Sequence, residues 1–240
     1  MSKIFITGST DGLGQMAAAL LVQQHHEVVL HARNTERGRE ASRRTPGASG
    51  VLTGDLSSIS ETKDLAFQLN KLGPFDAIIH NAGVYESSGN QILHINTLAP
   101  YILTCLVPKP KRLIYLSSGL HAGGRLNIEG IKKGSISYSD SKLHVVMLAL
   151  AMTRKWPHVY SNSVNPGWVP TKMGGRGAPD DLQKGCETQA WLAVSEDPEA
   201  KVSGRYFFHQ AERPFNHLAD DVSSQERLLT ALEEVTGLKL

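Results

Sequence analysis

Short runs of apolar, often β-branched residues alternate along the chain with longer segments in which apolar residues recur at helical spacing. The short runs predict seven strands, at residues 3–7, 27–32, 51–53, 77–80, 113–117, 161–164 and 205–208. The longer segments predict helices at residues 12–24, 36–44, 59–72, 90–106, 139–155 and 181–195. Alternation of this kind implies right-handed crossovers and a mostly parallel sheet with helices on both faces. We therefore predict an α/β fold with a doubly wound parallel sheet of about seven strands.

Length and composition narrow the classes of protein that the chain can represent. Its 240 residues, with no repeat and no low-complexity linker, predict a single domain spanning residues 1–240. The net charge of +2 makes nucleic acid and anionic membranes unexpected partners. We see neither a membrane span nor a secretory signal, and two cysteines cannot build a disulfide framework or a metal cluster. These features predict a cytoplasmic protein without a metal site.

Polar residues follow the predicted strands at the edge where doubly wound sheets bind their ligands. After the first strand, a glycine-rich turn opens a helix, which permits close backbone approach to a pyrophosphate at a positive helix end. The Gly-x-x-x-Gly-x-Gly spacing differs from the common dinucleotide fingerprint, and an ordinary strand-to-helix turn is the alternative. The position of the turn favours a Rossmann-type nucleotide site. Its expected contacts are Gly8, Ser9, Thr10, Gly12, Leu13 and Gly14.

The residues after the second and third strands bear on the choice of nucleotide. Arg33 and Asn34 stand where an acid would indicate NAD and where an arginine suits the 2′-phosphate of NADP. A guanidinium can bind a phosphate through two charge-assisted hydrogen bonds, so we predict NADP(H), with a solvated surface arginine as the alternative. Asp55 can accept a hydrogen bond from the adenine amine or serve as an acid before the next helix, and its position leaves both interpretations open.

Tyr138 and Lys142 are four residues apart at the start of a predicted helix and therefore share one of its faces. An ammonium group stabilises a phenolate and lowers a tyrosine pKa from its usual value of about 10. Such a pair can pass a proton to or from a carbonyl oxygen. A Tyr-x-x-x-Lys match also arises by chance, but its place between the fifth and sixth strands, downstream of Ser118, favours a catalytic site.

Together these motifs resemble the short-chain dehydrogenase/reductase family, in particular its retinol-dehydrogenase-like branch, which shares the extended stretch between Ser118 and Tyr138. One departure is His80, where the family often has asparagine. The matching residues run almost end to end: Thr7, Gly8, Gly12, Gly14, Asp55, Leu56, Asn81, Ala82, Gly83, Asn96, Ser117, Ser118, Tyr138, Lys142, Asn165, Pro166, Gly167 and Thr171.

The resemblance implies an NADP(H)-dependent oxidoreductase that transfers a hydride between the nicotinamide and a carbonyl or alcohol substrate. Tyr138 would be the general acid or base, and Lys142 would lower its pKa and bind the nicotinamide ribose. Ser118 would hold the reacting oxygen, and Asn96 would hold a water that links Lys142 to solvent. The remaining cofactor contacts implied are Leu56, Asn81, Ala82, Gly83, Pro166, Gly167, Val169 and Thr171.

The segment from residue 169 to residue 187 is rich in glycine and proline and predicts a mobile flap over the substrate, with a plain surface loop as the alternative. Trp168 and Met173 would give this flap an apolar wall. His121 follows Ser118 closely, but we interpret it as a loop histidine. Arg37 lies near the expected 2′-phosphate, although a solvated helix face is the simpler interpretation.

The helix that carries Tyr138 has more apolar surface than one sheet face needs, and members of the family often pair through it. We therefore expect a homodimer or homotetramer. A non-catalytic NADP-binding sensor or scaffold is the alternative function, although the catalytic Tyr, Lys and Ser are all present. A sugar-nucleotide epimerase or dehydratase would need an additional substrate domain, for which this chain lacks the length.

Overall fold

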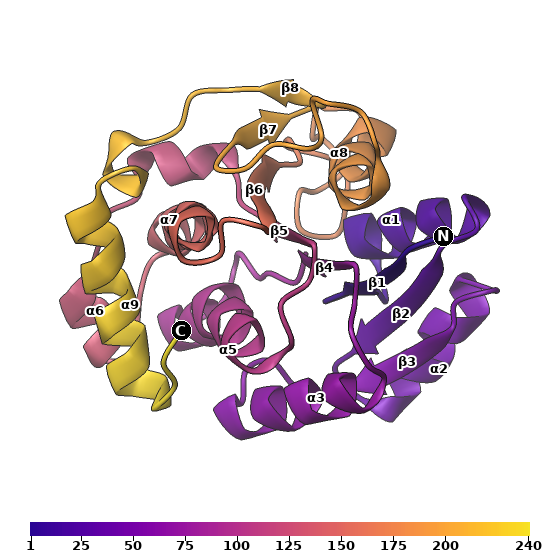
Figure 1. Cartoon of the computed structure of the whole chain (residues 1–240), viewed down its shortest axis with the longest axis horizontal. Helices are drawn as coiled ribbons and strands as arrows, with labels where there is room; N and C mark the ends of the chain where they lie inside the picture. The colour runs from indigo at the N-terminus through magenta and orange to yellow at the C-terminus, as the bar shows by residue number, and fades with distance from the viewer.

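The computed structural model describes residues 1–240 and is built around one eight-stranded sheet (Figure 1). The strand order is β3-β2-β1-β4-β5-β6-β7-β8, parallel throughout except for the antiparallel pair of β7 and β8. The strands are β1 (Lys3–Ile6), β2 (Glu27–Ala32), β3 (Gly50–Thr53), β4 (Ala77–His80), β5 (Arg112–Leu116), β6 (Tyr160–Asn165), β7 (Tyr206–Phe208) and β8 (Ala211–Glu212). The predicted doubly wound α/β class is confirmed.

The eighth strand is an addition to the seven predicted. His209 and Gln210 join β7 to β8 with positive φ values of 50° and 61°. Two consecutive residues of positive φ give a tight hairpin whose twist matches that of its strands. Asn-Gly and Asp-Gly are the usual residues in such a turn, so the His-Gln pair gave no sign of it.

Helices cover both faces of the sheet, as Figure 1 shows. One face carries α1 (Gly12–Gln23), α2 (Thr35–Arg44) and α8 (Leu182–Val194), and the other carries α3 (Ile59–Lys71), α5 (Ala99–Leu106) and α7 (Tyr138–Lys155). Strand β1 shows how the two cores arise, because successive side chains of a strand point to opposite faces. Phe5 joins the core under α3, α5 and α7, whereas Ile4 and Ile6 join the core under α1 and α8.

The predicted helix 90–106 is a continuous helical segment with a wider stretch in its middle. It consists of α4 (Gly89–Ile92), a π-helix η1 (Leu93–Leu98) and α5. π-helical turns are rare and often occur at functional sites. Asn96 lies within this stretch and is buried.

The C-terminal helix α9 (Val222–Thr236) and the short α6 (Ile128–Lys132) were not predicted. Helix α9 packs on α7 and α6 at the outer side of the molecule (Figure 1). Helix α7, whose apolar face led us to expect an oligomer, therefore packs against the chain's own α9. The apolar side chains of α7 on which that expectation rested are all buried: Leu143, Val146, Met147 and Leu150.

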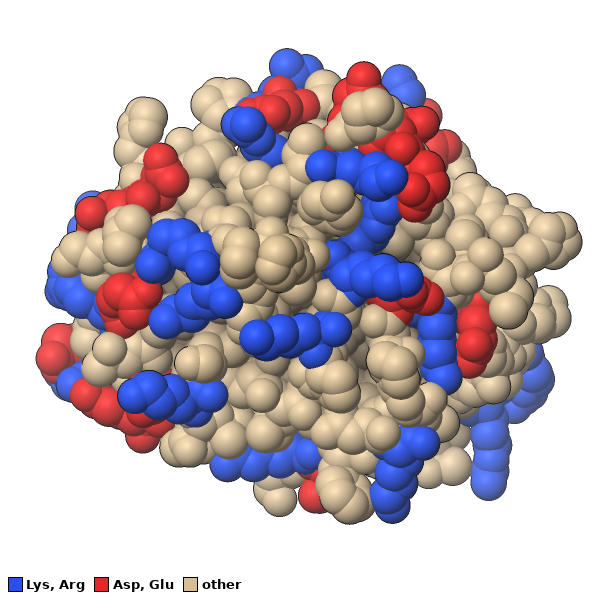
Figure 2. Space-filling view, in the orientation of Figure 1, with Lys and Arg blue, Asp and Glu red and all other residues tan.

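The surface shown in Figure 2 mixes both signs of charge, with Lys and Arg interspersed among Asp and Glu over this face. This distribution agrees with the small net charge of +2. No helix combines the length and the hydrophobicity that crossing a membrane requires. No group of three or more His, Cys, Asp and Glu side chains is arranged to hold a metal ion.

Candidate active site

Two cavities meet at the carboxyl edge of the sheet. The first, which we call the crevice, has a volume of about 520 Å³ and lies where the chain leaves β1 and β4 in opposite directions. The second, which we call the pocket, has a volume of about 710 Å³ and lies between the segments after β5 and β6. Tyr138 lines both cavities, together with Leu13, Ser117, Pro166, Thr171 and Met173.

Most of the predicted cofactor contacts line the crevice. They are Gly8, Thr10, Gly12, Leu13, Gly14, Arg33, Asp55, Leu56, Asn81, Ala82, Gly83, Tyr138, Lys142, Pro166 and Thr171. Gly167 and Val169 line the pocket instead, as does Ser118. Ser9, Asn34 and Asn96 line neither cavity.

The glycine-rich turn depends on its lack of side chains. Gly8 has a φ of 65°, and a Cβ there would lie 3.0 Å from the Cα of Ala82. A Cβ on Gly14 would overlap the carbonyl oxygen of Gly8 and the side-chain amide of Asn81. Asp11 caps α1 by accepting a hydrogen bond from the backbone N–H of Gly12. The backbone is thereby brought close to the crevice at the positive end of a helix.

Ser9 and His31 hold this turn in place through hydrogen bonds. The buried Ser9 hydroxyl donates to the carbonyl of Ile6 and accepts from the backbone N–H of His31. The Nδ1 atom of His31 accepts from the N–H of Gly8 at 3.0 Å, so the proton is on Nε2, which donates to the carbonyl of Gly54 at 2.9 Å. Burial lowers the pKa of His31 to about 4, which keeps the ring neutral. The sequence pattern did not single out His31, whose only signal was its place near the end of β2.

Asn81 ties the loops after β1 and β4 together. Its side-chain Nδ2 donates to the carbonyls of Thr7 and Gly8 at 2.9 and 3.3 Å. The Thr7 hydroxyl accepts from the backbone N–H of Ala82 at 3.0 Å. These contacts hold the two loops together where they line the crevice.

Positive side chains gather at the outer end of the crevice. Arg33 is exposed and lines it, while Asn34 caps α2 by accepting from the N–H of Arg37. Arg37 also lines the crevice, where it donates to the Thr10 hydroxyl at 3.3 Å, so its interpretation as part of a purely solvated face was wrong. The region therefore carries two guanidinium groups, of which that of Arg37 already pairs with the carboxylate of Glu40 at 3.2 Å.

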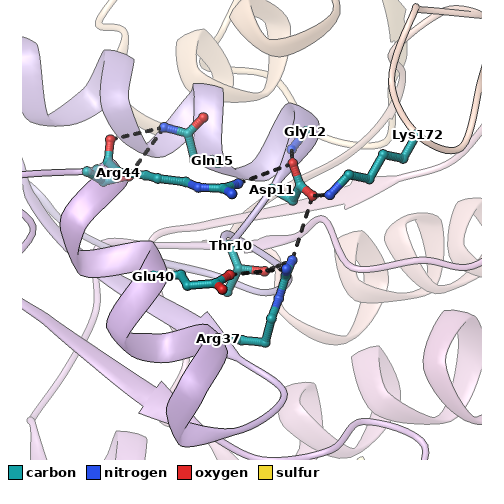
Figure 3. Close-up of polar contacts among 9 residues, drawn as sticks. Thr10, Asp11, Gly12, Gln15, Arg37, Glu40, Arg44 and Lys172 are labelled. Carbon is teal, nitrogen blue, oxygen red and sulfur yellow. Dashed lines mark hydrogen bonds and ion pairs between the residues drawn. The ribbon is translucent and has the colours of Figure 1, made fainter. Parts of the chain in front are cut away.

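Figure 3 shows the carboxylate of Asp11 at the centre of this positive cluster. Arg37 and Arg44 approach it at 3.7 Å each, and Lys172, from the segment after β6, donates a hydrogen bond to it. The bond from Lys172 is the main reason that the Asp11 pKa lies below its usual value. Lys172 thereby connects the predicted flap to the glycine-rich turn across the crevice.

Asp55 lines the crevice, but its side chain is already engaged locally. Its Oδ1 atom accepts from the backbone N–H and the hydroxyl of Ser57 at 2.9 and 2.7 Å. The cap of α3 is Ser58, not Asp55. Asp55 therefore shapes the turn after β3.

Tyr138 and Lys142 open α7, with Ser137 as the cap of the helix. The Nζ atom of Lys142 lies 5.5 Å from the centroid of the Tyr138 ring and donates to the carbonyl of Leu116 at 2.9 Å. A Cβ on Gly83 would lie 3.1 Å from this Nζ. The glycine after β4 thus leaves room for the lysine to reach the sheet edge beside the tyrosine.

Burial dominates the titration of both side chains. It raises the pKa of Tyr138 to about 12, although a hydrogen bond involving Ser118 acts in the opposite direction. Burial also lowers the pKa of Lys142 to about 8. The expected lowering of the Tyr138 pKa by Lys142 is therefore not what the structure shows. Near neutral pH, Tyr138 is a protonated phenol that can donate to an acceptor in the pocket.

The two adjacent serines face different surroundings. The Ser117 hydroxyl is buried and donates to the carbonyl of Lys142 at 2.8 Å, which ties the end of β5 to α7. Ser118 lines the pocket, and its hydroxyl oxygen accepts from the N–H of Leu120 at 3.2 Å. Ser118 is thus the serine whose hydroxyl can reach a ligand beside Tyr138.

Asn96 is a buried connector between the loop after β4 and α7. Its Oδ1 accepts from the N–H of Val84 at 2.8 Å, and its Nδ2 donates to the carbonyl of Val84 and the hydroxyl of Ser141 at 3.0 Å each. Gly83 lies beside both Asn96 and Lys142. The amide group therefore helps to hold the lysine-bearing turn of α7 against the crevice.

His121 supports Ser118 from outside the pocket, which corrects its interpretation as a plain loop histidine. The buried ring packs at a tilt of 41° against Tyr206, with the ring centroids 4.4 Å apart, and its Nε2 accepts from the N–H of Asn216. The proton is therefore on Nδ1, which donates to the carbonyl of Ser118 at 2.7 Å. The Asn216 side chain in turn donates to the carbonyls of His121, Ala122 and Gly124.

The predicted flap begins as a chain of turns and ends in a helix. The segment from Trp168 to Asp180 follows β6, and α8 begins at Leu182, so the last part of the range 169–187 is helical. Val169 is buried, whereas Trp168 and Met173 are exposed and line the pocket. The turn begins at Gly167, whose φ of 88° favours glycine.

Known proteins share this arrangement to different degrees. A family model described as short chain dehydrogenase matches residues 2–111. An uncharacterized oxidoreductase of Emericella nidulans is 47% identical over 99% of this chain and 98% of its own length. A short-chain dehydrogenase of Penicillium rubens is 41% identical over 100% of this chain and 99% of its own.

A more distant relative supports the retinol-dehydrogenase-like branch, and a solved structure shows the common fold. Retinol dehydrogenase 13 of Mus musculus is 24% identical over 99% of this chain and 84% of its own length. Among solved structures, the complex of Pseudomonas aeruginosa RhlG with NADP superimposes with a TM-score of 0.69 at 21% identity. This likeness covers 86% of the present chain and 96% of that chain, and it shows a common fold.

Proposed function

Because the chain belongs to the short-chain dehydrogenase/reductase family, in its retinol-dehydrogenase-like branch, we propose that it is an NADP(H)-dependent oxidoreductase acting on a carbonyl or alcohol substrate. The observation that carries this proposal is the position of Tyr138, which lines both the crevice and the pocket. A group held in the first cavity and a group held in the second would therefore meet beside its hydroxyl.

The crevice fits a dinucleotide. It runs from Arg33 and Arg37 at one end, past the glycine-rich turn, to Tyr138 and Lys142 at the other. A side chain on Gly8 or Gly14 would collide with neighbouring loops, so the turn keeps its backbone N–H groups accessible. NADP(H), when bound there, supplies or accepts the hydride.

The chain's own residues handle the proton and the position of the substrate. Tyr138 donates its proton to the carbonyl oxygen during reduction and accepts it back during oxidation. Lys142, fixed beside the phenol by the carbonyl of Leu116, would hold the ribose of the nicotinamide. Ser118 orients the same oxygen from the pocket side.

The central test replaces the phenol and keeps the ring. We expect Tyr138→Phe to bind NADPH with unchanged affinity and to lose turnover by about 1000-fold or more, because general acid–base catalysis is removed. Cofactor affinity is measured by NADPH fluorescence, and turnover is measured by NADPH oxidation with 2,3-butanedione. Tyr160→Phe, at the far end of β6, is the matched control. Full turnover in Tyr138→Phe would contradict the mechanism.

The choice of NADP over NAD is proposed to rest on Arg33 and Arg37. Replacing either residue by alanine removes a guanidinium from the outer end of the crevice. We expect the KM for NADPH to rise about tenfold, while the KM for NADH changes less than twofold or so, because only NADPH carries the 2′-phosphate. Equal changes for both cofactors would remove these arginines from the phosphate site.

A further inference from the structure

Large apolar side chains are concentrated at the mouth of the pocket. The chain exposes eight of them: Met1, Phe67, Leu72, Tyr85, Leu120, Trp168, Met173 and Val222. Four of the eight line the pocket, although they come from three separate segments of the chain: Tyr85, Leu120, Trp168 and Met173. Clusters of exposed apolar surface in a concave site mark the binding of an apolar ligand.

The aromatic rings at this mouth are held in fixed positions. Tyr85 packs edge-to-face on Tyr138, with the ring centroids 4.7 Å apart and the planes at 71°. The indole N–H of Trp168 donates to the carbonyl of Gly174 at 2.8 Å, and its backbone N–H donates to the carboxylate of Asp180 at 2.6 Å. The polar edge of the indole is therefore satisfied within the protein. Trp168 as a whole is 61% exposed, so its ring is free to stack on a ligand.

The charges of the two cavities are opposite in character. The crevice is lined by four positive side chains and two carboxylates (Arg33, Arg37, Lys142 and Lys172 with Asp11 and Asp55), whereas the pocket is lined by Glu86 and Asp180 and by no lysine or arginine. Glu86 is adjacent to Tyr85 and is exposed at the rim. An anionic ligand would lose hydration in the pocket without gaining a cationic partner, and it would be repelled by both carboxylates.

We propose that the substrate is a planar aromatic carbonyl compound, uncharged or cationic, and that Tyr85 and Glu86 determine this specificity. The inference rests on the proposed function, because the carbonyl must reach Tyr138. The aromatic body of the substrate lies at the mouth of the pocket, in contact with the rings of Tyr85 and Trp168 and the side chains of Leu120 and Met173. A positive substituent faces Glu86, and carboxylated or phosphorylated analogues are rejected.

Charge selection is tested with acetophenone and with two para-substituted derivatives that carry opposite charges. They are 4-acetylbenzoate, unsubstituted acetophenone and 4-(trimethylammonio)acetophenone, with the aliphatic 2,3-butanedione as a reference substrate. We expect kcat/KM for the cation to exceed that for the anion by about tenfold or more, because two carboxylates line the pocket. Glu86→Gln is expected to reduce this ratio by about threefold or more, and kcat/KM for 2,3-butanedione is the reference that corrects for any general loss of activity.

Aromatic selection is tested at Tyr85. We expect Tyr85→Leu to raise the KM for acetophenone about tenfold more than the KM for 2,3-butanedione, because an aromatic contact with the ligand is lost. Tyr85→Phe keeps the ring and is expected to restore the original KM, which distinguishes stacking from a role of the hydroxyl.

Binding is measured independently of turnover by quenching of tryptophan fluorescence with the same acetophenones. Trp168→Phe removes the tryptophan of the mouth and is expected to abolish most of the quenching, while Trp156 and Trp191 remain. Equal kcat/KM for the anion and the cation, or an equal loss for both ketone classes in Tyr85→Leu, would overturn the inference and leave the proposed function intact. Failure to reduce any ketone, 2,3-butanedione included, would overturn the proposed function, and the substrate assignment with it.

Discussion

The two halves of the sheet contribute to the site in different ways. In the half formed by β3, β2, β1 and β4, most crevice residues lie just after a strand end, and Asn81 and His31 hold them through hydrogen bonds between the loops of adjacent strands. In the half formed by β5 to β8, the segment of Ser118 is held by Asn216, which is about a hundred residues later in the chain. The first half depends on the turns at the ends of adjacent strands, and the second depends on packing against a segment near the C-terminus.

This difference predicts that the crevice is intolerant of small changes in its turn. Gly14→Ala adds one methyl group that would overlap the carbonyl of Gly8 and the side chain of Asn81. We expect the affinity for NADPH to fall by about 100-fold or more, because a backbone group must move in a tightly packed turn. Fluorescence titration with NADPH measures the change.

The matched control for Gly14→Ala is Gly50→Ala, in β3 of the same half. A Cβ on Gly50 has no heavy atom within 4 Å. We expect this variant to bind NADPH as tightly as the parent protein. Unchanged affinity in Gly14→Ala as well would show that the turn is less constrained than its geometry indicates.

The second half is predicted to depend on α9. Leu232 of α9 is fully buried in the core that contains α7. Leu232→Ala is expected to lower the free energy of unfolding by about 3 kcal/mol, because a large buried side chain leaves a cavity. Denaturant unfolding measures this loss, and Arg227→Ala, on the exposed side of the same helix, is the control. Equal stability of the two variants would mean that α9 contributes little to the core.

The same contrast explains what could be predicted from the sequence. Hydrophobic periodicity predicts the strands and helices as far as α3, and they appear where expected. The turn glycines and the polar residues after the strands predict most of the residues that line the crevice. Helix α9 was missed although it begins after the cap Asp221 and ends at Gly237, which has a φ of 68°. The roles of His31 and His121 could not be predicted, because each depends on hydrogen bonds to another segment.

The support of the glycine-rich turn by His31 predicts a weakness in acid. The pKa of His31 is about 4 in the folded protein, against 6.5 for an ordinary histidine. Between these values the unfolded chain binds a proton that the folded chain does not, so stability is lost as the pH falls from 6.5 toward 4. From pH 6.5 to 4.5 this loss is about 2 kcal/mol for one histidine.

The acid effect is isolated by comparison with His31→Gln, which has no titrating group at that position. The free energy of unfolding is measured by urea titration at several pH values for both proteins. We expect the parent protein to lose more stability than the variant over this range, because the other buried histidines, His80, His121 and His144, titrate in both. Parallel curves for the two proteins would place the acid sensitivity elsewhere.

The smallest predicted effect tests the long-range support of Ser118. Asn216 lies at the solvent-accessible edge of the second half. Asn216→Ala removes three hydrogen bonds that its side chain donates to the turn at residues 119–124, and one that it accepts from the N–H of Leu218. We expect kcat to fall about fivefold with KM for NADPH unchanged, because Ser118 is displaced while the crevice is not. His217→Ala, at the exposed neighbouring residue, should retain full kcat. A rise in the KM for NADPH in Asn216→Ala would mean that the two halves are coupled and that the crevice is not fixed by its local contacts alone.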